Sequence, residues 1–405
     1  MKILQILDIN SVEVDQNLFN ITAVNRFKDP YWVEFIQQYF LQADVEIKIL
    51  SLDKIDLSKK WLINVDINMW NWHSYKGNIF NTFNDLIKKE LKYGNAFLIL
   101  NHQCESYTTK FFELFYSKEI DIPYKKIIYM VAAADVETSY KNFIEKNHIP
   151  AEKQFNTIYA HHVYKRFHHG VDINSFQFST VSKTKKFLSL NRMWRKHRVM
   201  LVSMLSHKNL LQHGYVSLGV FPEEKNQAYA LLEHRHMQQG FLKIIDSLPL
   251  QIDNVDLKIN QFQMNSLDIF YYQQSCFSLV SSTMALAEQE LSVGFTEKEI
   301  KPILARHPFI IWNRPGVLKH LQSMGFLTFE SWFDESYDDE LDDILRLEKI
   351  IVEVERLCNM SFDQWELLLD EMKPVLNHNF NRMTNYTAEH CFFNSDLKKL
   401  LYYVS

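Results

Sequence analysis

Basic side chains crowd a predicted strand-to-helix junction in the second half of the chain. The apolar run Phe187–Leu190 predicts a short strand, and a helix is predicted to begin near Arg195. The junction carries Asn191, Arg192, Arg195, Lys196, His197 and Arg198, with Lys183, Lys185 and Lys186 just upstream. A helix N-terminus attracts anions, and the guanidinium group matches phosphate oxygens. Because cations at that end oppose the helix dipole, a bound phosphate would compensate them; a solvated basic turn is the alternative.

A second segment, Phe295–Ile303, has the residues of a capped helix that could bind a ligand. Thr296 fits the N-cap position, and Glu297 in the first turn could accept hydrogen bonds from both hydroxyls of a ribose. Lys298 and Lys301, three residues apart on one helical face, could reach a diphosphate. A capped surface helix without a ligand explains these residues equally well.

Strands that alternate with helices are predicted to position both segments. In the first half we expect strands at Lys2–Leu7, Val45–Leu50, Trp61–Val65, Ala96–Leu100, Lys126–Val131 and Asn156–Tyr159, and helices at Pro30–Gln42, Ile79–Lys92, Thr108–Ser117 and Val136–Asn147. A polar linker is expected over Gly170–Ser175 and Ser179–Lys186. This alternation favours a mostly parallel sheet covered by helices.

The alternating pattern then restarts. We expect strands at Phe187–Leu190, Tyr215–Leu218, Phe277–Val280 and Phe309–Trp312, helices at Arg195–His207, Glu297–Ala305 and Gly316–Met324, and a helical end beyond Asp338. Two α/β halves with terminal helices predict a cleft between two domains, and ligands of open parallel sheets bind beyond the carboxyl ends of the strands.

Composition narrows the class of protein. With 405 residues the chain is expected to form about two domains. A net charge of −5 argues against a protein that binds nucleic acid over its whole surface. None of the nine glycines forms GxGxxG, and Val220-Phe221 follows Gly214 and Gly219 where a P-loop needs Lys-Ser/Thr. Phosphate must therefore be held by side chains and helix N-termini.

The location is predicted to be cytoplasmic, or the host cytoplasm if the protein is viral. The four cysteines are far apart and form neither a zinc motif nor a disulfide framework, which suits a reducing compartment. We expect neither a signal peptide nor a transmembrane segment, because no apolar run is long enough.

The two segments together resemble one family of enzymes. The sequences FLSLNRMWRKHR, GFTEKEIKPILARHPFIIWNRPGVLKHLQSMGFLTF and SWFDESYD are similar to stretches of GT-B glycosyltransferases, those with two Rossmann-like domains, in the branch common in large DNA viruses, phages and bacteria. The resemblance covers roughly residues 185–355. The Thr-Glu-Lys segment is also similar to the donor-binding signature of fucosyltransferases and exostosin-like enzymes.

The resemblance implies a binding site for a nucleoside-diphosphate sugar. By it, Asn191, Arg192, Arg195 and Arg198 would contact the diphosphate, and Glu297, Lys298 and Lys301 would contact the ribose and phosphates. Two departures concern the identity of the sugar. Met193-Trp194 replaces a frequent Arg-Pro pair, and Ser282 stands where many relatives have glutamate.

A general base for the acceptor is predicted in the first half. Leu98–Leu100 runs into a polar loop in which relatives often carry an acidic residue, so Glu105 is the first candidate and His102 the second. An ordinary loop residue is the alternative for each. Other acidic residues at or near predicted strand ends are Asp8, Asp66 and Asp135.

No obligatory metal is expected. His161-His162 and His168-His169 are adjacent pairs whose side chains on a strand would point to opposite faces, which makes them poor chelators. The acidic run Asp334–Glu340 resembles no magnesium motif and fits a solvated helix start. Arginine and lysine are therefore expected to meet the charge of the diphosphate.

The sequence thus predicts an α/β glycosyltransferase of GT-B architecture with C-terminal helices. Residues 1–175 would form an acceptor-side Rossmann-like domain, 186–360 the nucleotide-sugar domain and 361–405 a helical extension. A metal-independent hexosyl- or pentosyl-transferase would move a sugar to a glycan hydroxyl or, in a second version, to a modified base of viral DNA. The alternative is a catalytically inactive binding or scaffold protein of the same fold.

Overall fold

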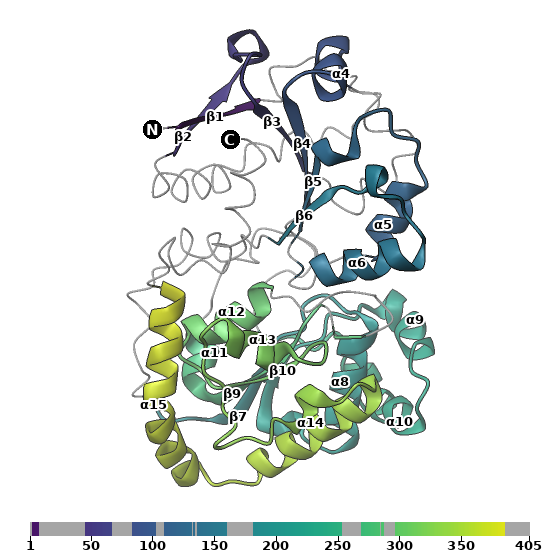
Figure 1. Ribbon diagram of the computed structural model, residues 1–405. Coiled ribbons are helices and arrows are strands. Elements are labelled where there is room, and N and C mark those ends of the chain that lie inside the picture. Colours follow the sequence, from purple (N-terminus) through teal and green to yellow (C-terminus); the bar gives the residue numbers. More distant parts are fainter. Residues whose placement is uncertain are drawn as a thin grey trace. The chain divides into compact units, whose positions relative to one another are not determined.

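The computed structural model describes residues 2–7, 45–66, 83–102, 109–131, 133, 136–159, 181–252, 269–283, 285–286 and 296–384. The chain divides into two compact units, each with its own sheet (Figure 1). Unit 1 contains residues 1–166, 290–294 and 386–405, and unit 2 contains 167–289 and 295–385.

Unit 1 is built on a six-stranded parallel sheet in the order β2-β1-β3-β4-β5-β6. The strands are β1 (Lys2–Leu7), β2 (Val45–Leu50), β3 (Trp61–Asp66), β4 (Ala96–His102), β5 (Ile127–Val131) and β6 (Asn156–Tyr159), and the helices are α4 (Asp85–Lys92), α5 (Thr109–Tyr116) and α6 (Val136–Lys146). All six strands were predicted within two residues. The predicted helix at Pro30–Gln42 and the segment Gly170–Ser175 lie outside the described residues.

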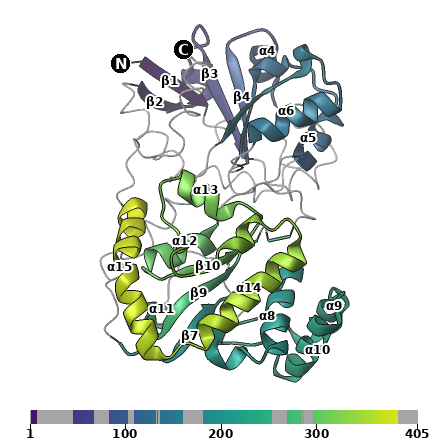
Figure 2. The same cartoon turned by 60° about the horizontal axis from the view of Figure 1, so that its bottom comes forward.

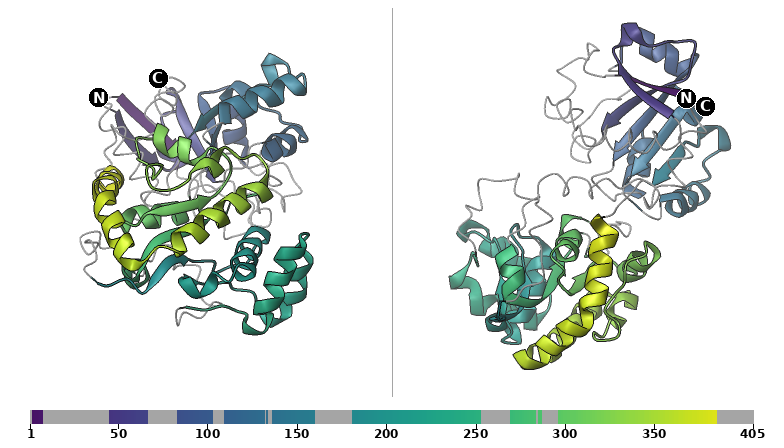
Figure 3. Two further views of the ribbon diagram at one scale, coloured as in Figure 1. Left: turned by 90° about the horizontal axis from the view of Figure 1, so that it is seen from below. Right: turned by 90° about the vertical axis from the view of Figure 1, so that its left-hand side faces the viewer.

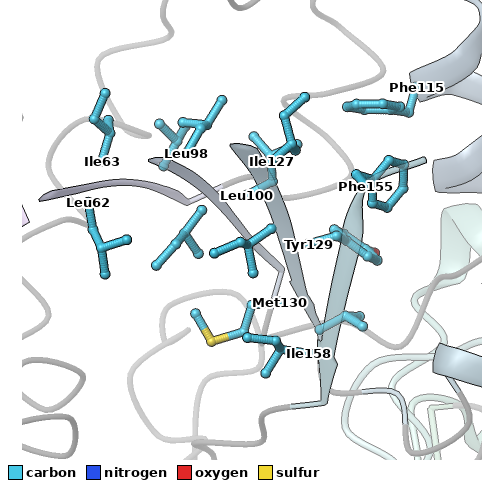
Figure 4. Close-up of a cluster of buried hydrophobic side chains, with 14 of the residues drawn as sticks. Leu62, Ile63, Leu98, Leu100, Phe115, Ile127, Tyr129, Met130, Phe155 and Ile158 are labelled. Atoms are coloured by element: carbon cyan, nitrogen blue, oxygen red, sulfur yellow. The ribbon is translucent and has the colours of Figure 1, made fainter. Parts of the chain in front are cut away.

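Apolar side chains fill both faces of the first sheet (Figure 4). Leu98, Ile99 and Leu100 of β4 are all fully buried, although successive residues of a strand point to opposite faces. A parallel sheet covered on both sides requires such continuous apolar runs, which is why these strands could be read from the sequence. On one side Phe111 of α5 stacks on Tyr129 of β5, with ring centroids 3.9 Å apart.

Unit 2 is built on a four-stranded parallel sheet in the order β10-β9-β7-β8 (Figure 2). The strands are β7 (Lys185–Ser189), β8 (Gly214–Val216), β9 (Ser275–Ser281) and β10 (Phe309–Trp312). The helices are α8 (Lys196–His207), α9 (Lys225–Ala230), α10 (Arg235–Ile244), α11 (Ile269–Gln274), α12 (Glu297–Leu304), α13 (Val317–Ser323), α14 (Asp343–Cys358) and α15 (Phe362–Thr384), the long C-terminal helix seen in Figure 3.

The strand order of unit 2 contains a topological switch point. The chain passes from β7 through α8 outward to β8, and from β9 through α12 outward in the opposite direction to β10. Because both crossovers are expected to be right-handed, α8 and α12 cover opposite faces of the sheet. A crevice for a ligand is expected where the two crossovers diverge, beyond the carboxyl ends of β7 and β9.

Helix α8 is the central helix of unit 2. Every residue from His197 to Ser206 is buried, as expected for a helix enclosed by the core. Helix α10 crosses it closely at Gly240, where an added Cβ atom would lie 1.9 Å from the Ser203 carbonyl oxygen. Only glycine permits this approach.

Residues of the acidic run before α14 make buried contacts with neighbouring elements, which corrects the expectation that this run is a solvated helix start. Asp338 is buried, and its carboxylate accepts hydrogen bonds from the backbone N–H groups of Leu318 (3.1 Å) and Lys319 (3.3 Å) in α13. The buried Tyr337 hydroxyl accepts one from the Ile311 N–H in β10 at 3.3 Å. These carboxylate and hydroxyl groups therefore hold β10 and α13 together.

Candidate anion-binding site

Asn191 is fixed just beyond the carboxyl end of β7. Its backbone N–H donates to the Ser217 hydroxyl at 2.9 Å, and its carbonyl accepts from the Gly219 N–H at 3.1 Å. Its side-chain amide donates to the Ser189 hydroxyl at 3.1 Å. The side-chain carbonyl oxygen is buried and has no hydrogen-bond partner among the described residues. Asn191 thus presents an acceptor at the switch point.

Helix α8 begins without local compensation for its dipole. Arg195 occupies the N-cap position with an extended backbone, no side chain caps the helix, and its first turn contains no acidic residue. The guanidinium of the buried Arg198 donates to the Met193 carbonyl at 2.5 Å, which closes the turn between β7 and α8. Arg192 in that turn is partly exposed. This N-terminus is therefore strongly positive.

His197 joins the two predicted clusters. It is fully buried on α8, and its ring lies edge-on to Trp312 at the end of β10, with ring centroids 6.2 Å apart. Burial holds the pKa of His197 well below its usual value, and the positive charges of Arg198, Arg195 and Lys298 lower it further. Since Lys298 belongs to α12, positive charges at the N-termini of both α8 and α12 lie close enough to His197 to lower its pKa.

The N-terminus of α12 is anchored to the strand ends by Glu299. Its buried carboxylate accepts hydrogen bonds from the backbone N–H and the hydroxyl of Thr296, both at 2.7 Å. The Asn313 amide, just after β10, donates to the other oxygen at 3.3 Å, and the Ser282 hydroxyl, just after β9, donates as well. Burial raises the pKa of Glu299, and the hydrogen bonds from Ser282 and Thr296 and the charge of Lys298 offset this rise only in part.

Ser282 therefore has a defined task in this chain. Its hydroxyl donates to the carboxylate of Glu299 in α12. The Ser282 N–H also donates to the Trp312 carbonyl at 2.9 Å, which ties the ends of β9 and β10 together. Ser282 thus connects the ends of β9 and β10 with the N-terminus of α12.

Four buried polar side chains near this point have atoms without a hydrogen-bond partner in the part of the chain that the structure describes. They are the Asn191 carbonyl oxygen, both ring nitrogens of His197, the Ser281 hydroxyl and the Trp312 indole nitrogen. Ser281 and Trp312 are register partners at the ends of β9 and β10. Because each such group costs about 1–3 kcal/mol, their concentration at a switch point indicates a ligand site.

A pocket of about 300 Å³ lies beside the first turn of α8. Aliphatic side chains of α8, α10 and the start of α14 line it, among them Met200, Met237 and Ile344. Lys196 and Glu233, which form an ion pair at 2.8 Å, line it as well. The acidic residues Asp342 and Asp343 line it too, so the pocket offers both apolar and polar groups to a further part of a ligand bound at the helix N-terminus.

The structure brings most of the predicted binding residues to one end of the second sheet. Asn191, Arg192, Arg195 and Arg198 lie between β7 and the first turn of α8, and Lys298 lies in the first turn of α12. Lys301 follows three residues later on α12, and Glu297 begins that helix, although its side chain lies outside the described residues. Their roles in ligand binding stay predictions.

Three lysines do not belong to this site, which corrects the predicted extent of the basic cluster. Lys183, Lys185 and Lys186 lie at the amino end of β7, opposite the end that leads to α8. Their ammonium groups donate to the backbone carbonyls of Gln273 (2.9 Å), Gln212 (2.7 Å) and Met360 (2.7 Å), respectively. The predicted linker Ser179–Lys186 is also too long, since Lys185 and Lys186 belong to β7.

Sequence reasoning missed His197, Ser281, Trp312 and Glu299 as candidate site residues. His197 was visible among the basic residues of the junction, but burial between two helices and a strand end cannot be read from residue types. Glu299 had a clear signal, since Thr-x-x-Glu is the pattern of a capping box. The other motif histidine, His307, is structural: it accepts from the Ser278 hydroxyl at 2.8 Å and donates to the Ser275 carbonyl at 2.9 Å.

The predicted general bases differ in their surroundings. His102 is buried at the end of β4, where its Nδ1 atom is 2.8 Å from the Tyr129 hydroxyl and burial lowers its pKa to about 3. This gives His102 a place in the core of unit 1, and its role as a base stays a prediction. Glu105, Asp8, Asp135 and both histidine pairs lie outside the described residues. Asp66 ends β3, and only its backbone is described.

Two searches of the described residues gave no further site. No group of three or more histidine, cysteine, aspartate or glutamate residues in the described ranges could hold a metal ion. Among the helices described, none is both long and apolar enough to span a bilayer. The expectation that no divalent ion is required stays a prediction.

Comparison with known proteins found similarity to solved structures but to no family model. No protein-family model matches the chain, and no curated protein matches it. Among solved structures, the chain is similar to a glycosyltransferase from Rickettsia africae ESF-5, with a TM-score of 0.44 and 13% sequence identity, over 99% of this chain and 97% of that chain. At this similarity, the choice of function depends on the geometry of the site.

Proposed function

We propose that the protein is a glycosyltransferase that moves a sugar from a nucleoside-diphosphate donor to a hydroxyl acceptor. The observation that carries this proposal is the placement of Arg195, Arg198 and Lys298 in the first turns of α8 and α12, beside the buried His197 at the switch point of the second sheet. Arginine and lysine at two helix N-termini suit a diphosphate, which carries charge on both phosphates. The adjacent pocket offers space for another part of the donor.

The chemistry follows from this charge distribution. When the bond between the sugar and the diphosphate of the donor breaks, negative charge develops on the leaving diphosphate, and fixed cations at that position stabilise it. Arg192, Arg195, Arg198, Lys298 and Lys301 would supply these cations. Asn191 would contact the donor beside the diphosphate, where its side-chain carbonyl oxygen, which has no hydrogen-bond partner among the described residues, can accept a hydrogen bond from a hydroxyl group. Glu297 would bind the ribose. A base, with Glu105 preferred to His102, would remove the proton of the acceptor hydroxyl.

The finer assignments belong to the same proposal. They are the GT-B architecture, the viral, phage and bacterial branch, metal independence, transfer of a hexose or pentose, and a cytoplasmic location. A glycan acceptor is preferred to a base of DNA, because Lys183, Lys185 and Lys186 do not contribute to the basic surface around α8. Duplex DNA that binds with a steep salt dependence would reverse this preference.

Paired substitutions test the proposal. Arg192→Ala and Lys298→Ala should each lower transfer from nucleotide sugars at least about a hundredfold, because each removes a charge that stabilises the leaving group. Lys185→Ala is the matched control, since this lysine binds the Gln212 carbonyl at the other end of β7 and should leave transfer unchanged. Normal turnover by Arg192→Ala and Lys298→Ala, with folding intact, would reject the site.

An inactive binding or scaffold protein is the rival to this proposal. Such a protein would bind nucleotide sugars without releasing the nucleotide, whatever acceptor or water is offered. The release of nucleoside diphosphate from a UDP-, GDP- or dTDP-sugar distinguishes an active transferase from an inactive binding protein. The release is measured for the unmodified protein and for Lys298→Ala. Release by the unmodified chain alone supports transfer or hydrolysis at this site.

A further inference from the structure

His197 lies in the first turn of α8, next to the helix N-terminus where an anion would bind. It is the second residue of α8, and it is buried against Trp312 at the carboxyl end of the second sheet. Neither of its ring nitrogens has a hydrogen-bond partner among the described residues. A buried imidazole without hydrogen-bond partners costs stability relative to an apolar side chain packed against Trp312.

The groups around His197 make its charged form unfavourable in the ligand-free protein. Arg195 and Arg198 come from its own helix and Lys298 from α12, while β10 contributes the neutral Trp312. Together with burial, these three cations depress the pKa of the ring. The ring is therefore neutral at physiological pH, with one nitrogen able to donate and the other able to accept a proton.

We propose that His197 is a binding residue of this site, which hydrogen-bonds the diphosphate of the donor and takes up one proton from solvent when the donor binds. The proposal rests on the proposed function, because it requires a diphosphate at the first turns of α8 and α12. It adds a residue to the site and makes donor affinity respond to pH.

The direction of the effect follows from charge. A bound diphosphate offsets the repulsion from Arg195, Arg198 and Lys298, so the pKa of His197 rises on binding. A group whose pKa is higher in the complex than in the free protein takes up a proton on binding, and the affinity increases as the pH falls. One proton sets a limit of about tenfold in affinity per pH unit.

Calorimetric titration with UDP-glucose, GDP-mannose and dTDP-glucose at pH 8 and pH 6 tests this coupling. Nucleotide sugars are used because their diphosphate, esterified at both ends, does not titrate in this range. We expect the best of these donors to bind at least about fivefold more tightly at pH 6. Its binding heat should depend on the ionisation heat of the buffer, as proton uptake requires.

Variants separate a binding role from a packing role. His197→Asn can still form a hydrogen bond but cannot titrate, so it should lose the buffer-dependent heat and most of the pH dependence. His197→Phe should fill the space and bind the donor about tenfold more weakly. His207→Asn, at the other end of α8, is the matched control and should bind like the unmodified protein with the same pH dependence.

The outcomes distinguish this inference from the proposed function. If no nucleotide sugar binds at either pH, the proposed function fails and the inference fails with it. If a donor binds with the same affinity and no proton uptake at both pH values, the role of His197 is wrong while the donor site stands. If His197→Phe does not fold, His197→Asn and the proton uptake of the unmodified chain still decide.

Discussion

Replacement of Glu299 is expected to loosen the N-terminus of α12 and weaken donor binding. The carboxylate accepts two hydrogen bonds from Thr296 and one each from Asn313 and Ser282. Glu299→Ala removes the capping interaction, worth about 1 kcal/mol, and leaves buried donors without an acceptor at about 1–3 kcal/mol. We therefore expect Glu299→Ala to lower the free energy of unfolding by about 2–4 kcal/mol. We expect it to weaken donor binding about tenfold.

Urea denaturation measures the stability change, and calorimetric titration measures the change in donor affinity. Glu224→Ala is the matched control, because Glu224 makes a comparable contact, accepting from the Phe221 N–H at 2.9 Å, on a more exposed 3-10 turn of the same unit. It should cost no more than about 1 kcal/mol. Glu299→Gln, which keeps the volume but can accept at only one oxygen, should fall between the two. If Glu299→Ala lost no more stability than Glu224→Ala, the anchoring role of Glu299 would be refuted.

Three further predictions follow from buried groups. Burial raises the pKa of Glu335 to about 7. Its contribution to the free energy of unfolding, up to about 3 kcal/mol, is therefore present below pH 4.5 and is lost as the pH rises through 7. Glu335→Gln should reduce the difference in stability between pH 5 and pH 8, and an equal difference in both proteins would contradict this. Gly240→Ala should lower the unfolding free energy, measured by urea denaturation, by about 2 kcal/mol, because the added Cβ atom would lie 1.9 Å from the Ser203 carbonyl oxygen. Unchanged stability would show that α8 and α10 can separate. Burial raises the pKa of the Cys276 and Cys358 thiols to about 12. Iodoacetamide should therefore modify both thiols only after unfolding, which peptide mass spectrometry can follow. Rapid labelling of the native protein would contradict their burial.

The strands could be predicted because covered parallel sheets demand a simple pattern. β10 matches its predicted range residue for residue, because its four residues are an uninterrupted buried apolar run, the pattern of a strand covered on both faces. Helix α10 was not predicted, although Met237, Phe241 and Ile244 show helical spacing. Its glycine reads as a helix breaker in the sequence, whereas in the structure it permits the close crossing with α8.

The candidate site could be predicted only in part. Residue types showed where arginine and lysine gather, and the strand-to-helix junction showed where an anion could bind. The extent of the cluster was wrong at Lys183–Lys186, because an extended strand advances about 3.3 Å per residue and carries those lysines to its other end. His197 and Ser281 could not be found, since their significance lies in burial without partners, a property of the assembled fold.

A structure of the protein with the nucleoside diphosphate that binds it tests the central claim most directly. One diphosphate should lie between the first turns of α8 and α12, with donors of the α8 segment and of Lys298 each about 3 Å from its oxygens. A diphosphate that contacts only one of these helices, or that binds elsewhere on the chain, would contradict the shared site.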